Sequence, residues 1–295
     1  MNKAADTRST TEFPGRLYVV GTPIGNPGDI SLRALETFGK VDLIAAEDTR
    51  NTRRLLAGHG IDRPLISLHE HNEDRRTEEL IAKLSTGLSI ALVSDAGTPT
   101  LSDPGYRLVT EAVAADIRVV PIPGPSAAVA ALSVSGLPTD TFLFLGFPPR
   151  KPAKRIAFLQ GLAEENRTLI FYESPKRLAG LLSDLSDIVG ERRAVLSREM
   201  TKPFEEFIRG TLSDIHGAIQ RKKALKGECT LLVEGKKKSE DVSQKALREI
   251  VVGEFDAGET GVSALSKKIA ERYGISKKKV YEEVIRMKKE RGEAG

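Results

Sequence analysis

Short apolar runs alternate with amphipathic stretches through about the first 120 residues, and this alternation constrains the fold more than any other feature. The apolar runs are predicted strands, at 16–20, 42–47, 64–68, 88–94 and 117–122. The stretches between them are predicted helices, at 31–39, 52–60, 74–84 and 104–116. Strands that alternate with helices favour a parallel sheet with crossover helices, and continuous apolar runs fit strands buried on both faces. The sequence therefore predicts an α/β fold.

A proline-rich stretch at 121–140 interrupts this alternation, and we place a domain boundary within it or just after it. Further strands are predicted at 141–147, 168–173, 192–199, 204–210 and 228–235, with helices near 152–164 and 176–188. Several of these strands follow one another closely, which favours a mixed sheet. The predicted organisation is a loose tail at 1–14, α/β domains at 15–135 and 136–237, a linker at 236–242 and a small all-helical unit at 243–295.

The composition excludes several classes of protein. No stretch reaches the roughly 18 uninterrupted apolar residues of a membrane-spanning helix, and residues 1–14 lack the apolar core of a signal peptide. The one cysteine, Cys229, cannot form an internal disulfide or a Cys-rich zinc site. We therefore expect a cytoplasmic protein without a metal, in which Cys229 is a small buried residue. Tryptophan is absent, which argues against a base-stacking platform for single strands.

Positive charge is concentrated near the C-terminus. Residues 263–291 contain ten Lys or Arg and four Glu, while the whole chain has a net charge of only +4. Two apolar stripes in this segment predict a helix-turn-helix with its turn at Gly274. Lys277, Lys278 and Lys279 would then begin the second helix, where such a motif meets nucleic acid. The alternative is a pair of helices that only packs or stabilises a dimer.

Three loops after predicted strands are rich in glycine, proline and small polar residues, at 21–29, 94–99 and 123–127. The first is neither a Rossmann fingerprint nor a Walker loop, because its glycines fall at 21, 25 and 28 and no Lys-Ser/Thr pair follows. Each loop alone fits a tight turn as well as a ligand site. Three of them at strand ends in one domain favour a shared pocket. Backbone groups, small hydroxyls and one acid would suit an adenosine moiety and a sulfonium cation.

Six motifs occur in order over roughly residues 16–235: YVVGTPIGNPGD, AAEDTR, SDAGTPTLSDPG, PGPSA, FYESPKR and SREMTKPFEEFIRG. In these motifs the chain resembles the tetrapyrrole methylases, and EDTR, ESPKR and FEEFIRG are similar to the branch that methylates ribose 2′-oxygens of bacterial small-subunit ribosomal RNA. The resemblance implies two α/β domains with S-adenosylmethionine in the cleft between them, a cytidine of the decoding region as acceptor, and a homodimer. We expect the ribosomal RNA to be met in the assembled small subunit, with naked RNA as the alternative. That branch usually has histidine where this chain has Lys176, which removes one proton carrier.

The resemblance also implies the contacts with the methyl donor. They are Ile24 in the first loop, Asp95 and Thr98 in the second, Ser126 and Ala127 in the third, and Tyr172 and Thr230 from the second domain. Close approach of the backbone to the donor is expected at Gly21, Gly25, Gly97 and Gly124.

A base that takes the hydroxyl proton would assist the transfer. The candidates are Glu47, Asp48 and Glu173, with His69 and Glu70 as further possibilities, and the sequence does not choose among them. Glu47 and Asp48 fit helix caps equally well, and His69 fits a locally hydrogen-bonded side chain. Glu173 fits an ion pair with the residue four positions on.

Cations are the candidates for holding RNA. Arg50 and Arg177 are predicted phosphate clamps, because guanidinium matches phosphate oxygens bidentately. The segment PPRKPAKR is predicted to contact phosphates through Arg150, Lys151, Lys154 and Arg155, against the alternative of an ordinary solvated loop.

Three hypotheses about function follow. The first is 2′-O-methylation of small-subunit ribosomal RNA. The second is methylation of a tetrapyrrole intermediate with the same fold, which would not need the basic segment or the basic C-terminal unit. The third is a non-catalytic nucleic-acid-binding protein, which would have no affinity for the methyl donor.

Overall fold

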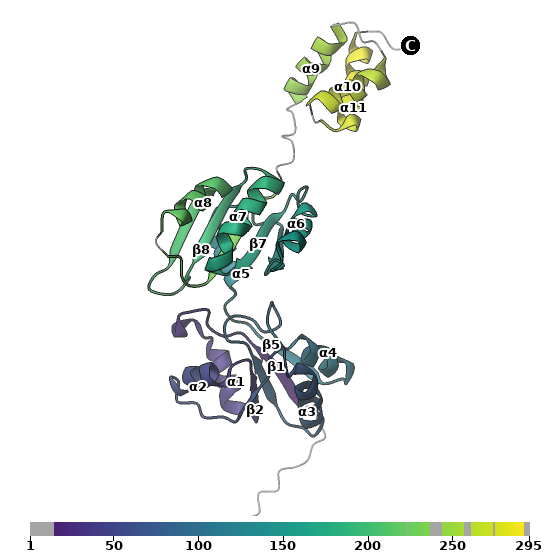
Figure 1. Ribbon diagram of the computed structural model, residues 1–295. Helices are drawn as coiled ribbons and strands as arrows, with labels where there is room; N and C mark the ends of the chain where they lie inside the picture. The colour runs from purple at the N-terminus through teal and green to yellow at the C-terminus, as the bar shows by residue number, and fades with distance from the viewer. Residues whose placement is uncertain (1–14, 223, 237–243, 257–260, 274, 292–295) are drawn as a thin grey trace, which may run out of the picture. The chain divides into compact units, whose positions relative to one another are not determined.

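The computed structural model describes residues 15–222, 224–236, 244–256, 261–273 and 275–291. The chain divides into two units, the first ending at Glu234 and the second beginning at Gly235. The first unit contains two α/β lobes, the first lobe (15–126) and the second lobe (127–234), and the second is the C-terminal unit (Figure 1). The predicted tail at 1–14 and most of the predicted linker lie outside the described residues.

The first lobe is a parallel sheet of five strands in the order β3-β2-β4-β1-β5. Its strands are β1 (Arg16–Val20), β2 (Leu43–Ala46), β3 (Leu65–Ser67), β4 (Ile90–Val93) and β5 (Arg118–Ile122). Its helices are the short η1 (Pro27–Asp29), α1 (Leu32–Lys40), α2 (Thr49–Ala57), α3 (Glu73–Ser85) and α4 (Tyr106–Ala114). The helices α1 and α2 cover one face of the sheet and α3 and α4 the other (Figure 1). The prediction of a parallel α/β domain is confirmed.

The helix α2 begins three residues earlier than predicted. Asp48 is its N-cap, and the Asp48 carboxylate accepts a hydrogen bond from the Arg50 backbone amide at 2.8 Å. An Asp at this position satisfies an amide that has no partner within the helix, so the helix starts at Thr49.

The second lobe is a mixed sheet of five strands in the order β6-β7-β10-β8-β9, as the closely spaced strands predict. The strands are β6 (Phe142–Gly146), β7 (Thr168–Glu173), β8 (Arg193–Arg198), β9 (Glu206–Thr211) and β10 (Cys229–Val233). Only β6 and β7 pair in parallel, whereas β7, β10, β8 and β9 pair antiparallel along the sheet. The helices α6 (Pro152–Gln160), α7 (Pro175–Val189) and α8 (Leu212–Gln220) pack on one face, where Cys229 is buried with them.

The helix α5 (Ala127–Ser135) covers the other face of this second sheet. It lies within the stretch that interrupts the sequence pattern, and it packs through Ala131 and Leu132 against Ile170, Val195 and Leu232. The chain therefore changes lobe before α5, earlier than the predicted boundary at residue 135.

The C-terminal unit has three helices, α9 (Gln244–Asp256), α10 (Val262–Tyr273) and α11 (Lys277–Glu290). The predicted helix pair corresponds to α10 and α11, and its predicted turn at Gly274 lies outside the described residues. The helix α9 was not predicted, and it completes a small core with Leu265, Ile269, Val280 and Val284 through its own Val251. None of the helices described by the structure is both long and apolar enough to cross a membrane.

Candidate functional site

A cavity of about 360 Å³ lies where the strands of the first sheet end, between these ends and the second lobe. The carboxyl ends of parallel strands are where open α/β sheets bind ligands. Ten of the predicted site residues line it: Ile24, Glu47, Asp95, Gly97, Thr98, Ser126, Ala127, Tyr172, Glu173 and Thr230. The cavity thus brings together segments that are far apart in the sequence.

Three loops of the first lobe form one wall of the cavity. They are loop 1 (21–26), loop 2 (94–105) and loop 3 (123–126). Thr22 and Gly97 exchange backbone hydrogen bonds of 2.8 and 3.1 Å, which join loop 1 to loop 2. Loops 1 and 3 meet backbone to backbone, because a Cβ added to Gly21 would lie 2.8 Å from Gly124 Cα. Gly21 and Gly124 are absent from the cavity wall, and their role in this structure is to let the two loops approach.

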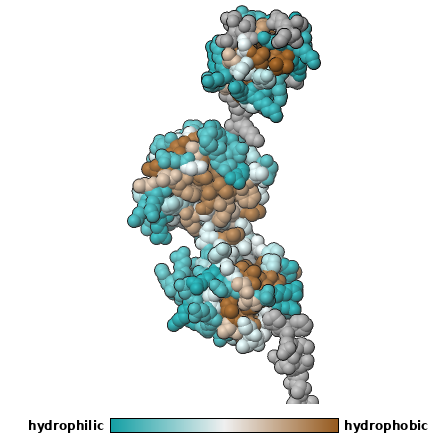
Figure 2. Space-filling model, turned by 90° about the vertical axis from the view of Figure 1, so that its right-hand side faces the viewer, coloured by the Kyte–Doolittle hydropathy of each residue, from teal (hydrophilic) through white to brown (hydrophobic). Residues whose placement is uncertain are grey.

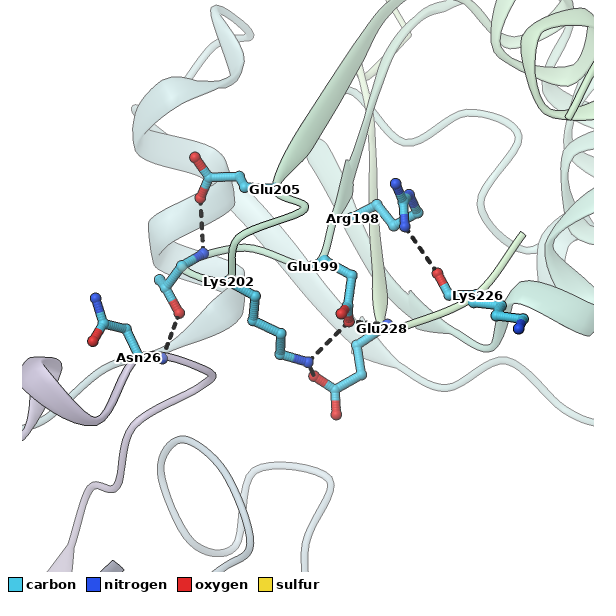
Figure 3. A network of polar contacts seen from close by, with 8 residues as sticks. Asn26, Arg198, Glu199, Lys202, Glu205, Lys226 and Glu228 are labelled. Carbon is cyan, nitrogen blue, oxygen red and sulfur yellow. Dashed lines mark hydrogen bonds and ion pairs between the residues drawn. The ribbon is translucent and has the colours of Figure 1, made fainter. Parts of the chain in front are cut away.

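Loop 1 also contacts the second lobe through the segment after β8 (Figure 3). The Asn26 amide donates to Thr201 Oγ1 at 3.0 Å, and a Cβ on Gly25 would lie 2.7 Å from that same oxygen. Lys202 Nζ bridges Glu199 at 2.9 Å and Glu228 at 2.8 Å. The segment after β8 is thereby tied to Glu228, a cavity residue that lies immediately before β10. Predicted Gly25 therefore lies at this contact between lobes, away from the cavity wall.

Tyr172 connects the second lobe to the start of α5. Its hydroxyl accepts a hydrogen bond from the Ala128 amide at 3.2 Å, and its ring makes edge contacts with Phe144 and Phe147. Burial raises the pKa of the Tyr172 hydroxyl, against the opposing effect of the Ala128 amide. The side chain is therefore a neutral, fixed wall of the cavity.

Five carboxylates line the cavity, from Glu47, Asp95, Asp103, Glu173 and Glu228. None of the described residues in its wall is Lys, Arg or His. A cavity with this lining favours a cation and disfavours an anionic ligand.

Asp95 is the most constrained of these acids. One of its oxygens accepts from the Asp48 amide at 3.1 Å and the other from Asn51 Nδ2 at 3.0 Å. Its own amide donates to Glu47 Oε2 at 3.1 Å. The ends of β2 and β4 are thereby joined, and the Asp95 carboxylate has a fixed orientation.

The predicted base candidates differ in their surroundings. Asp48 is the least suited of them, because it caps α2, pairs with Arg50 at 2.6 Å and lies outside the cavity wall. Hydrogen bonds from Arg50 hold the pKa of Asp48 well below its usual range, which makes it a weak proton acceptor. Burial raises the pKa of Glu47, and the Asp95 amide partly opposes this effect. His69 also lies outside the wall, with Nε2 3.2 Å from Asn72 Nδ2.

Glu173 and Arg177 form an internal ion pair. Glu173 is 2% exposed, and its Oε2 lies 2.9 Å from Arg177 Nη2 without the alignment of a hydrogen bond. Arg177 also donates to the Pro148 carbonyl at 2.7 Å. In this structure the guanidinium is engaged inside the protein, so its predicted role as a phosphate clamp would require these contacts to break.

The predicted cations after β6 divide into two groups. Arg150, Lys151 and Lys154 are exposed. Arg155 is buried on α6, where its Nε lies 2.6 Å from Asp184 Oδ2 on α7, so of the four predicted cations it is the least accessible to RNA.

In the C-terminal unit, Lys277, Lys278 and Lys279 form the exposed first turn of α11. Ser276 is the N-cap by position, and its side chain makes no capping hydrogen bond. Lys176, where the resemblance leads one to expect histidine, is exposed at the start of α7.

Sequence reasoning missed Asp103, which lies in the cavity wall at the far end of loop 2. Burial raises its pKa to about 6, and the neighbouring Glu47 and Asp95 carboxylates act in the same direction. Thr100 and Ser102 have φ of 73° and 69°, an unusual left-handed conformation for residues other than glycine. The motif SDAGTPTLSDPG contains Asp103, but no spacing rule distinguishes it from a turn residue before proline.

Comparison with known proteins adds independent information. The family Tetrapyrrole (Corrin/Porphyrin) Methylases matches residues 16–216. Ribosomal RNA small subunit methyltransferase I of Haemophilus influenzae is 46% identical, covering 92% of this chain and 97% of that protein. The protein of the same name from Xylella fastidiosa is 54% identical, over 75% of this chain and 82% of its own length.

Solved structures share the fold at low sequence identity. Cobalt precorrin-4 methyltransferase matches with a TM-score of 0.57 and 16% identity, covering 74% of this chain and 94% of its own. Uroporphyrin-III-C-methyltransferase from Thermus thermophilus matches with a TM-score of 0.54 and 22% identity, covering 75% and 94%. The arrangement of two lobes around a strand-end cavity, the family match and the extensive identity show that this chain belongs to the tetrapyrrole methylases, in the family of the ribosomal RNA small subunit methyltransferases I.

Proposed function

We propose that this protein transfers a methyl group from S-adenosylmethionine to the 2′-oxygen of a cytidine in the decoding region of small-subunit (16S) ribosomal RNA. The observation that carries the proposal is the acidic cavity between the lobes, with cations on exposed surface outside its wall. The names of the relatives support ribosomal RNA as the substrate class. Such an enzyme would act in the cytoplasm, where ribosomal subunits are assembled.

The chemistry of the cavity fits the proposed donor. When bound, S-adenosylmethionine supplies a methyl group on a positively charged sulfur. The carboxylates of Asp95 and Glu47 give the cavity the opposite charge, and the fixed orientation of Asp95 requires no rearrangement on binding. Ile24, Ala127 and Tyr172 supply apolar wall for a nucleoside, and the loop backbones supply hydrogen-bonding groups. Holding donor and acceptor in line can lower the barrier by up to about 7–11 kcal/mol.

Exposed cations favour RNA over the tetrapyrrole alternative. Arg150, Lys151 and Lys154 are exposed after β6, and a porphyrinoid substrate would not need them. The likeness to tetrapyrrole methyltransferases therefore supports the fold and not the substrate. A purely nucleic-acid-binding protein would not need a cavity of this charge.

Transfer of labelled methyl tests the proposal directly. Undermodified small subunits, naked ribosomal RNA and a uroporphyrinogen-type tetrapyrrole would each be incubated with the protein and labelled S-adenosylmethionine. We expect label in a ribose of the ribosomal RNA, and comparison of particle with naked RNA identifies the true substrate. Label in the tetrapyrrole alone would overturn the proposal, and so would a donor titration that shows no binding.

Neutralising the exposed cations after β6 is expected to weaken RNA binding without altering the cavity. In the variant Arg150→Gln/Lys151→Gln/Lys154→Gln, each lost phosphate contact should reduce the slope of log affinity against log salt by about 0.7–0.9. The matched control replaces three exposed cations of the first lobe with Gln: Arg16, Lys40 and Arg118. Arg16 and Arg118 begin β1 and β5, at the strand ends opposite to the cavity, and Lys40 ends α1. Binding assays over a range of salt compare the two triple variants, and equal slopes would refute the assignment.

The C-terminal unit and a second copy of the chain are the other proposed partners. Lys277, Lys278 and Lys279 at the start of α11 support RNA docking by the C-terminal unit, since helix N-terminal turns can contact phosphate. Figure 2 shows apolar side chains gathered on one face of the second lobe, whose exposed hydrophobic residues include Phe142 and Ile156. An exposed apolar face supports a homodimer. Sedimentation equilibrium should then give twice the mass of one chain.

A further inference from the structure

Five carboxylates line the cavity, and three of them already have strong partners. Asp95 accepts two hydrogen bonds, while Glu173 and Glu228 each form an ion pair. Protonation would weaken the existing contacts of each of these three acids. They are therefore better suited to holding the wall and the ligand in place than to accepting a proton. Glu47 and Asp103 are the two remaining acids, and neither forms an ion pair with any residue that the structure describes, so we look among these two for the group that accepts a proton.

Of these two acids, Glu47 is the one that already accepts a backbone hydrogen bond. Its Oε2 accepts the Asp95 amide at 3.1 Å, and this hydrogen bond links the ends of β2 and β4. Among the residues that the structure describes, Asp103 has the neutral Ser94 hydroxyl beside it and no cationic partner, and the charged or titratable groups that face it are Glu47, Asp95 and the Tyr172 hydroxyl. Its pKa of about 6 leaves it ionised at neutral pH, yet more basic than an ordinary aspartate.

Loop 2 contacts the second lobe at the residue before Asp103. Ser102 has a left-handed φ, and a Cβ added to Gly146 would lie 2.7 Å from Ser102 Oγ. Gly146 ends β6, immediately before the segment with the exposed cations Arg150 and Lys151. Loop 2 therefore carries the predicted donor contact Asp95 near one end and Asp103 near the other, and beside Asp103 it contacts the strand that precedes the proposed RNA surface. Unfavourable backbone angles kept at such a position are characteristic of functional sites.

We infer, on the basis of the proposed function, that Asp103 is the general base of the methyl transfer. The 2′-oxygen forms a bond to the methyl carbon while the carbon–sulfur bond breaks and its electron pair stays on sulfur. The hydroxyl proton passes to a carboxylate oxygen of Asp103, which then releases it to water. The positive charge of the sulfonium is lost and one proton is released, so charge balances. Glu47 acts as a positioning residue that holds loop 2.

The test is single-turnover methylation of undermodified small subunits by the full-length chain across pH 5–9, with donor affinity measured separately by calorimetry. For the wild type, log rate should rise with unit slope and level off above the Asp103 pKa of about 6, because the base must be ionised. Asp103→Asn should bind the donor within about twofold of wild type. Its rate should fall roughly 10²- to 10⁴-fold, and the acidic limb of its profile should disappear.

Two further variants separate a base from a structural residue. Asp103→Ala should regain activity on addition of formate, a small carboxylate that can occupy the vacated space, whereas the wild type should not respond. Glu47→Gln should keep the acidic limb. An Asp103→Asn variant that keeps the limb while Glu47→Gln loses it would overturn the inference and leave the proposed function intact. Failure of the wild type to label ribosomal RNA would overturn the proposed function, and the inference with it.

Discussion

Replacing Gly21 or Gly124 by alanine should strongly weaken binding of the methyl donor. A Cβ on Gly21 would lie 2.8 Å from Gly124 Cα, and a Cβ on Gly124 would lie 2.7 Å from the Gly21 carbonyl oxygen. Both close neighbours are backbone atoms, so relief requires loops 1 and 3 to separate. Overpacking of this kind costs roughly 1–3 kcal/mol. If this cost destabilises the arrangement of loops 1 and 3 that binds the donor, donor affinity drops about 5- to 150-fold.

The matched control is Gly39→Ala on α1, where an added Cβ meets no atom within 4 Å. Alanine inside a helix is about 0.5–1 kcal/mol more favourable than glycine, so this variant should be slightly more stable and bind the donor normally. Calorimetric titration with S-adenosylmethionine and thermal unfolding of all three variants provide the comparison. Equal donor affinity in Gly21→Ala and Gly39→Ala would show that close contact of the loops is unimportant for binding.

These glycines also illustrate what a sequence can reveal about the site. Glycine-rich loops at three strand ends were sufficient to predict a shared pocket, because the ends of parallel strands lie at one edge of a sheet. The individual role of each glycine was not accessible. Gly97 lines the cavity, whereas Gly21 and Gly124 contact each other and Gly25 contacts Thr201. Such roles depend on which loop lies opposite, and sequence spacing does not contain that information.

Charged residues were predicted less well, for a physical reason. Arg150 and Arg155 are five positions apart in one basic segment, yet one is exposed and the other is buried against Asp184. Helix α6 begins between them, and Arg155 is one of its buried residues whereas Arg150 precedes the helix. Asp103 was missed because its carboxyl acquires its basicity from burial and from neighbours on other strands. The protonation behaviour of a side chain is a property of the folded surroundings.

The fold was easier to predict where periodicity is strong. The five strands of the first lobe follow the apolar runs closely, since strands buried on both faces are apolar throughout. The helix α5 was hidden because its residues are small and apolar on every side, and it lies between prolines and Gly136. The boundary between lobes was misplaced for the same reason.

Replacing Arg177 by alanine should destabilise the fold far more than it affects contact with RNA. Glu173 is 2% exposed, and Arg177 is the cation 2.9 Å from its carboxylate. Removing one partner of a buried pair leaves an uncompensated charge, which costs about 3–5 kcal/mol. Arg177 retains some exposure, so we expect a loss near 3 kcal/mol, seen as a midpoint lower by roughly 6–12 °C for a unit of this size.

Two further variants identify the origin of this loss of stability. The double variant Glu173→Gln/Arg177→Ala should recover much of the stability, because it removes the buried charge together with its partner. Arg50→Ala should leave the unfolding midpoint near that of the wild type and weaken RNA binding, since the Arg50 side chain is 84% exposed. If Arg177→Ala instead unfolds like the wild type and binds RNA more weakly, Arg177 leaves Glu173 to hold a phosphate. RNA binding would then break the ion pair that exists in the free protein. The Glu173 carboxylate in the cavity wall would lose its cationic partner when the substrate binds.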